Sequence, residues 1–167
     1  MELKAIIVYY SQGGNTEYAA EKLAAGIGAD LLRIEPRKAY PSSGFRKFFW
    51  GGKSAVMAEA PELAGYPFDG GAYDEVIFGF PVWAGTFAPP IRTFVRENAG
   101  TLKDKKLSAF ACQSGAGAEK AFAGLEKCLG RGLDHTLILI DPKDKPCEAN
   151  EKAMENYIKE FTKTSEV

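Results

Sequence analysis

The sequence predicts an α/β protein in which a doubly wound, five-stranded parallel sheet carries helices on both faces. Two observations support this fold class. Strand-like and helix-like segments alternate along almost the whole chain, which is the pattern of repeated βαβ units. The first strand-like segment, residues 3–10, is a nearly continuous apolar run, as expected of a parallel strand that is buried on both faces.

The elements follow one another in a regular order. Strands are expected at residues 3–10, 31–35, 73–80, 107–112 and 136–140. The helices between and after them have apolar residues at helical spacing, including Leu23, Phe94, Leu125 and Tyr157. The expected strand order is 2-1-3-4-5, for which the ligand crevice lies beyond the carboxyl ends of the first and third strands.

Length, charge and cysteine content restrict the class of protein. A chain of 167 residues is expected to form a single domain, residues 1–167, that is large enough to bury a core. The formal net charge of −1 argues against a nucleic-acid or membrane-surface protein. We expect no secretory signal and no membrane span, because a strand is predicted from Leu3 onward and no apolar run is long enough. Three cysteines without C-x-x-C spacing indicate neither a disulfide framework nor a zinc site. The expected location is cytoplasmic.

A glycine-rich turn separates the first strand from the first helix, with the residues Ser11, Gln12, Gly13, Gly14, Asn15 and Thr16. The backbone N–H groups of such a turn and the positive end of the helix dipole form an anion site. The side chains of Ser11, Asn15 and Thr16 add further donors. Because no Lys or Arg falls between Lys4 and Lys22, the loop must hold its anion with neutral donors. We expect a bound phosphate; the alternative is a tight turn with ordinary N-capping by Asn15 or Thr16.

A second loop is expected after the third strand, with the residues Pro81, Val82, Trp83, Ala84, Gly85 and Thr86. Trp83 offers a flat aromatic face on which a planar ring can stack, and the alternative is a tryptophan that caps the core. A third loop ends the fourth strand and includes Cys112, Gln113, Ser114, Gly115 and Gly117. For Cys112, a small buried residue at a strand end is favoured over a redox thiol.

The three loops together resemble those of flavodoxins. Residues 11–16 resemble the phosphate loop of this family, [ST]-x-T-G-x-T, with Gly13 where threonine is common. Residues 78–86 resemble the loop around the flavin ring, and residues 110–117 match the second flavin loop by position. The resemblance implies a short-chain flavodoxin that binds FMN noncovalently. The 5′-phosphate would lie at residues 11–16 and the ring between residues 81–86 and 112–117.

The chain departs from flavodoxins in two respects. Its second flavin loop has no tyrosine, so the outer face of the flavin is expected to be open or covered by an aromatic residue from elsewhere. Electron-carrier flavodoxins are typically strongly acidic, whereas this chain has a net charge of −1. We therefore expect its second reduction potential to be less negative than theirs.

A basic, aromatic segment does not fit the minimal fold. Residues 36–58 contain five Lys or Arg residues and no acid, together with Phe45, Phe48, Phe49 and Trp50. One interpretation is a solvated helix with a buried apolar face. A second is that residues 37–53 dock an acidic redox partner, and a third is that they hold the phosphates of a nicotinamide nucleotide.

Two functions remain open. The first, which the size and the motifs favour, is electron transfer between redox partner proteins. The second is an NAD(P)H-dependent flavin oxidoreductase that reduces a quinone or a similar acceptor on an open flavin face. In both, FMN supplies the redox chemistry, so no catalytic side chain is assigned. A phosphoacceptor signalling domain shares the topology but needs an acidic cluster after the first strand, and residues 11–16 contain no carboxylate.

Overall fold

The sheet positions the functional loops along one of its edges. A computed structural model describes residues 3–41, 53, 55 and 57–165 of the chain. Six strands form the sheet, with the bounds β1 (Ala5–Tyr9), β2 (Asp30–Arg33), β3 (Glu75–Trp83), β4 (Thr86–Phe87), β5 (Lys106–Gln113) and β6 (His135–Ile140). Their order is β2-β1-β3-β5-β6, with β4 paired to β3. The five longer strands are parallel and confirm the predicted order, whereas the short antiparallel β4 was not predicted.

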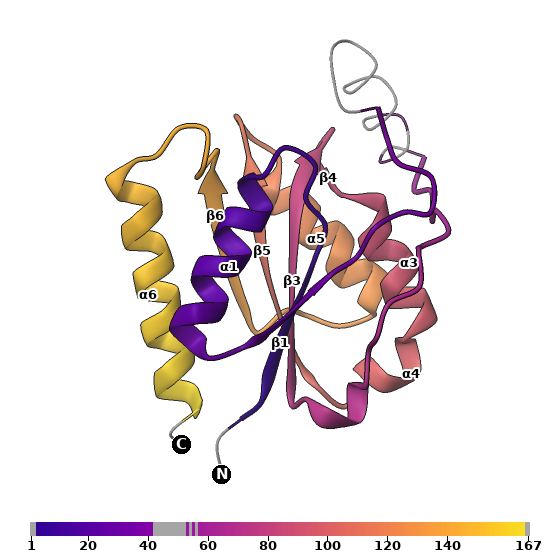
Figure 1. The fold of residues 1–167 in the computed structure, drawn as a ribbon, viewed down its shortest axis with the longest axis horizontal. Helices are drawn as coiled ribbons and strands as arrows, with labels where there is room; N and C mark the ends of the chain where they lie inside the picture. Colours follow the sequence, from indigo (N-terminus) through magenta and orange to yellow (C-terminus); the bar gives the residue numbers. More distant parts are fainter. Residues whose placement is uncertain (1–2, 42–52, 54, 56, 166–167) are drawn as a thin grey trace.

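Helices cover both faces of the sheet, as predicted. Their bounds are α1 (Asn15–Ile27), α3 (Pro89–Glu97), α4 (Ala99–Leu102), α5 (Ala118–Leu129) and α6 (Glu148–Ser165), with a 3-10 helix η1 (Gly70–Ala72). In Figure 1, α1 and α6 lie together on one face, and α3 and α5 lie on the other. Within the described part of the chain, no helix combines the length and apolar character that a membrane crossing requires.

The core consists of two clusters, one on each face of the sheet. Alternation along β1 sends Ile6 and Val8 toward the α3 and α5 side, where Phe94 and Leu125 are buried. Ile7 and Tyr9 point to the opposite side, which is covered by α1 and α6. Because β1 is buried along its whole length, its apolar run needs no polar face.

The segment predicted as a loop after the third strand is instead a β-hairpin, which corrects the sequence analysis. β3 continues through Trp83, turns at Ala84 and Gly85, and returns as β4. Ala84 and Gly85 have φ values of 51° and 72°. Two successive positive φ values are typical of the two-residue hairpin turn whose backbone twist matches that of the flanking strands. Pro81 was taken as the end of the strand, but Val82 and Trp83 are strand-forming residues and extend it.

Four loops meet at the carboxyl edge of the sheet. They are the β1–α1 loop, the β3–β4 hairpin, the β5–α5 loop and the β6–α6 loop, which Figure 1 shows side by side at the top of the molecule. Because parallel strands end at the same edge, the three loops singled out in the sequence lie together. Of the basic segment 37–53, residues 42–52 lie outside the described residues.

Candidate functional site

The four loops surround a cavity of about 460 Å³. This volume lies within the range of about 300–1,000 Å³ that is usual for small-molecule sites. The lining residues are Ser11, Gln12, Gly13, Asn15, Thr16, Pro81, Val82, Trp83, Ala84, Cys112, Ser114, Asp141, Asp144 and Lys145. All three predicted loops therefore contribute to one cavity, together with the β6–α6 loop.

The β1–α1 loop has the geometry of an anion site. Gly14 precedes α1 with a φ of 93°, a left-handed conformation that suits glycine. The Ser11 hydroxyl accepts a hydrogen bond from the Glu17 backbone N–H at 3.1 Å, which leaves its own hydrogen free to be donated. Thr16 is buried in the first turn of the helix and lines the cavity. These groups and the helix terminus face the cavity with donors and partial positive charge.

Asn15 has a structural role that the sequence did not reveal. Its side-chain oxygen accepts hydrogen bonds from the backbone N–H groups of Lys143 at 2.9 Å and Asp144 at 3.0 Å. Its amide nitrogen donates to the Asp144 carboxylate at 3.1 Å. Asn15 thus ties the β1–α1 loop to the β6–α6 loop, with one amide hydrogen left for a ligand.

Arg33 supports the β1–α1 loop from outside the cavity. Its guanidinium donates to the backbone carbonyl of Ser11 at 2.7 Å and forms ion pairs with Glu17 and Glu35. Its pKa is raised: the two carboxylates outweigh the opposing effect of partial burial. The sequence analysis missed this residue, although the parallel register places Arg33 beside Tyr9, two residues before Ser11.

Trp83 is the aromatic residue among the described residues that line the cavity. It is half-buried, and its ring meets Tyr10 and Tyr40 edge-on, at centroid distances of 5.7 Å and 5.2 Å. Burial raises the pKa of Tyr10, which keeps this neighbour uncharged. The Gln12 side chain donates to the Pro41 carbonyl at 2.8 Å. The first residues of the basic segment therefore lie against this wall, whereas its phenylalanines and Trp50 are outside the described residues.

The β5–α5 loop contributes Cys112 and Ser114. Burial raises the pKa of the Cys112 thiol to about 12, despite a hydrogen bond with Thr16, so the thiol is protonated at neutral pH. This supports the buried structural role. The Ser114 hydroxyl donates to the Asp141 carboxylate at 2.9 Å.

Six predicted site residues do not line the cavity, namely Gly14, Gly85, Thr86, Gln113, Gly115 and Gly117. Several of them shape the loops instead. Gln113 accepts a hydrogen bond from the Ala118 backbone N–H at 2.9 Å and so caps α5. A Cβ atom on Gly117 would lie 3.0 Å from the Gly85 Cα, so glycine lets the hairpin approach α5. Their contact with a ligand remains a prediction.

Three lining residues were not predicted, and all belong to the β6–α6 loop. They are Asp141, Asp144 and Lys145. They carry no motif, and only the fold rule points to them, since the fifth parallel strand ends at the same edge as the others.

An open parallel sheet with a cavity between its first and third strand ends, and an anion-binding turn beside it, defines a doubly wound α/β protein of the nucleotide-binding kind. Residues 4–136 match the family described as Flavodoxin. This match spans well over half of the chain, so the chain belongs to the flavodoxin family.

Solved structures share the fold. A protein from Bacteroides eggerthii is 24% identical with a TM-score of 0.78, covering 96% of this chain and 98% of that one. A flavoprotein from Lactobacillus acidophilus, solved in complex with FMN, is 20% identical with a TM-score of 0.71, covering 85% and 95%. The two-electron reduced flavodoxin of Megasphaera elsdenii is 17% identical with a TM-score of 0.56, covering 92% and 97%. At these identities the likeness shows the fold.

Proposed function

We propose that this flavodoxin binds FMN in the loop cavity and transfers electrons between redox partner proteins in the cytoplasm. One observation carries the proposal. A single cavity joins an anion-binding helix terminus with a half-buried tryptophan, and these are the two features that a phosphorylated, planar cofactor needs. The membership of the family and the FMN complex of the Lactobacillus acidophilus flavoprotein support FMN as the cofactor.

The residues present fit FMN chemically. Ser11, Thr16 and the backbone N–H groups of residues 12–14 would hold the phosphate, and Trp83 would lie against the ring. Bound FMN supplies the one- and two-electron redox chemistry. Pro81, Val82 and Ala84 line the same cavity and would lie against the apolar part of the cofactor. Because the Cys112 thiol is protonated, it does not compete as a redox group.

One observation favours an NAD(P)H-dependent oxidoreductase as the second candidate. Among the described residues that line the cavity, Trp83 is the one aromatic residue, and the β5–α5 loop contributes none. An uncovered flavin face suits a nicotinamide that must stack for hydride transfer, whereas a carrier does not require one.

An anaerobic titration of the FMN-loaded protein with NADPH and then NADH tests the proposed function, with dithionite as the reference reductant. An electron carrier stays oxidised with both nucleotides and shows a long-lived one-electron-reduced state with dithionite. Rapid bleaching to the two-electron-reduced state by either nucleotide would contradict the electron-carrier proposal and support the oxidoreductase function.

The basic segment is the candidate docking surface for an acidic partner. Among its described residues, Arg37 pairs with Glu62 at 3.1 Å, so part of its positive charge is already balanced. Charge reversal at Arg46 and Lys47, which lie outside the described residues, is the direct test. Slower reduction of a partner by this double variant, with unchanged FMN binding, supports docking; unchanged kinetics contradict it.

A further inference from the structure

The β6–α6 loop forms a fourth wall of the cavity. The buried Asn150 side chain holds the start of this loop: its oxygen accepts from the Ile140 backbone N–H at 3.0 Å, and its amide nitrogen donates to the Ile140 carbonyl at 2.7 Å. Asp141 follows with a φ of 41° and accepts the hydrogen bond from Ser114. Further along, Lys143 and Asp144 are bonded to Asn15. The loop is therefore fixed to both neighbouring loops of the site.

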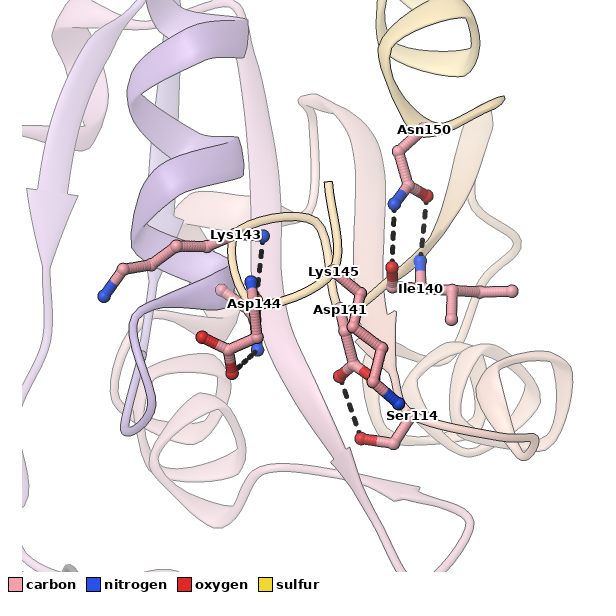
Figure 2. Close-up of polar contacts among 8 residues, drawn as sticks. Ser114, Ile140, Asp141, Lys143, Asp144, Lys145 and Asn150 are labelled. Atoms are coloured by element: carbon pink, nitrogen blue, oxygen red, sulfur yellow. Dashed lines mark hydrogen bonds and ion pairs between the residues drawn. The ribbon is translucent and has the colours of Figure 1, made fainter. Parts of the chain in front are cut away.

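Figure 2 shows how the side chains of this loop are arranged. The Asp141 carboxylate lies between Ser114 and the Lys145 ammonium group, which is 3.8 Å from the second carboxylate oxygen. The side chain of Lys145 is 76% exposed and that of Asp141 only 12%. Because Lys145 is exposed and its ion pair is loose, little energy holds it beside Asp141.

The charged side chains that line the cavity are mostly acidic, which disfavours the binding of a phosphate. Two carboxylates, those of Asp141 and Asp144, line the cavity, and both repel a dianion. Among the described residues of the lining, Lys145 is the only Lys or Arg. The β1–α1 loop contributes no cation of its own, since none falls between Lys4 and Lys22, but the Lys143 side chain packs beside Gly14, where an added Cβ atom would meet its Nζ at 2.6 Å.

From this arrangement we infer that Lys145 binds the phosphate of FMN directly and supplies positive charge from the cavity lining itself, in addition to the Lys143 ammonium group beside Gly14. The inference rests on the proposed function. In the absence of ligand Lys145 stays near Asp141, and a phosphate in the cavity draws its flexible ammonium group inward. Lys145 thereby sets the preference for FMN over riboflavin, which has the same ring but no phosphate.

The test compares FMN and riboflavin binding to the apoprotein, followed by quenching of flavin fluorescence at low salt. We expect Lys145→Gln to weaken FMN about tenfold, in the range of a hydrogen bond to a charged group, and to leave riboflavin unchanged. Raising the salt concentration should shrink the difference, because the ammonium group is exposed. Lys159→Gln is the control, because it makes the same charge change on α6, away from the cavity. At 1.5 Å per residue, Lys159 lies about 16 Å beyond the start of this helix. This variant should bind both flavins as the wild type does.

A double-mutant cycle with Asp141→Asn distinguishes two roles of Lys145. In one, Lys145 binds the phosphate directly; in the other, it only neutralises the Asp141 carboxylate. Asparagine keeps the oxygen that accepts from Ser114 and tolerates the positive φ. If Lys145 touches the phosphate, Lys145→Gln still weakens FMN several-fold in the Asp141→Asn background. Loss of that effect in the double variant overturns the inference.

The outcomes also separate this inference from the proposed function. A wild-type protein that binds neither flavin contradicts both. A wild-type protein that prefers FMN, with Lys145→Gln weakening both flavins equally or neither, overturns the inference and leaves the proposed function standing.

Discussion

Asn15 and Asp144, which are 129 positions apart, exchange two hydrogen bonds across the mouth of the cavity. The Asp144 backbone N–H donates to the Asn15 side-chain oxygen at 3.0 Å, and the Asn15 amide returns a bond to the Asp144 carboxylate at 3.1 Å. Asn15 begins α1, and Asp144 lies in the last loop of the fold. The pair therefore joins the first and the last loops of the site.

Replacing Asn15 with alanine should release the β6–α6 loop. We expect Asn15→Ala to lower the free energy of unfolding by about 1–2 kcal/mol, since three hydrogen bonds are lost, each weakened by its exposure to solvent. Hydrogen exchange at the Lys143 and Asp144 amides should become faster. Gln12→Ala is the control, because it removes the bond to Pro41 and leaves these amides protected. Equal exchange in Asn15→Ala and wild type would contradict the role of Asn15.

Gly28 is the control for a substitution at Gly14, which belongs to the phosphate loop. Both have left-handed backbones, with φ values of 93° and 79°, at opposite ends of α1. The left-handed backbone should cost each alanine variant about 1–2 kcal/mol of stability, measured by urea unfolding. A Cβ atom on Gly14 would also meet the Lys143 Nζ at 2.6 Å, the movable end of a flexible side chain, whereas one on Gly28 would meet nothing within 4 Å. Only Gly14→Ala should also weaken FMN, because only Gly14 belongs to the loop at the cavity. Equal FMN affinity in both variants would argue against a phosphate at this loop.

The three cysteines should differ sharply in thiol reactivity. Burial raises the pKa of Cys112 to about 12, whereas Cys147 is exposed and Cys128 is half-buried. At pH 8, a thiol reagent should therefore modify Cys147 in the folded protein and reach Cys112 only after unfolding. Mass spectrometry identifies the modified residue. Fast modification of Cys112 in the folded protein would show that its thiolate is accessible.

Glu75 makes stability depend on pH. Burial raises its pKa, and the Ser108 hydroxyl, His135 and Lys106 only partly oppose this. A carboxyl with a raised folded-state pKa binds more protons when folded, so its protonation favours folding at low pH. As the pH rises from the unfolded value of about 4.3 through the folded value, that contribution is lost.

Glu75→Gln removes this titration and keeps an oxygen that accepts from Ser108. We expect the variant to gain stability relative to wild type as the pH is raised from 4 to 7, measured as the difference in unfolding free energy. If the difference in unfolding free energy between Glu75→Gln and wild type were constant across this pH range, the raised pKa of Glu75 would be ruled out.

The fold followed from the sequence because its signals are local. The buried apolar run of β1 and the apolar stripes of the helices identify their elements directly, and the alternation of elements then gives the strand order. The Pro81–Thr86 segment was misjudged because proline suggested a strand end, while Val82 and Trp83 continued the strand.

The candidate site was only partly predictable, for a different physical reason. Ser11, Thr16 and Trp83 lie in motifs that sequence alone displays. Arg33 bonds to the Ser11 carbonyl, and Lys145 lines the cavity, through contacts that only the folded chain creates. No local pattern marks such residues, and only the strand order brings their loops to the same edge.

Amide chemical shifts of the labelled apoprotein during titration with FMN test the central claim most directly. We predict tight binding of one FMN, with shifts concentrated at residues 12–16, 82–84, 112–114 and 141–145. Residues around the small cavity at the opposite edge of the sheet, lined by Glu75, Lys106 and His135, should not shift. Shifts centred on that opposite edge, or no binding at all, would contradict the assignment of the loop cavity as the flavin site.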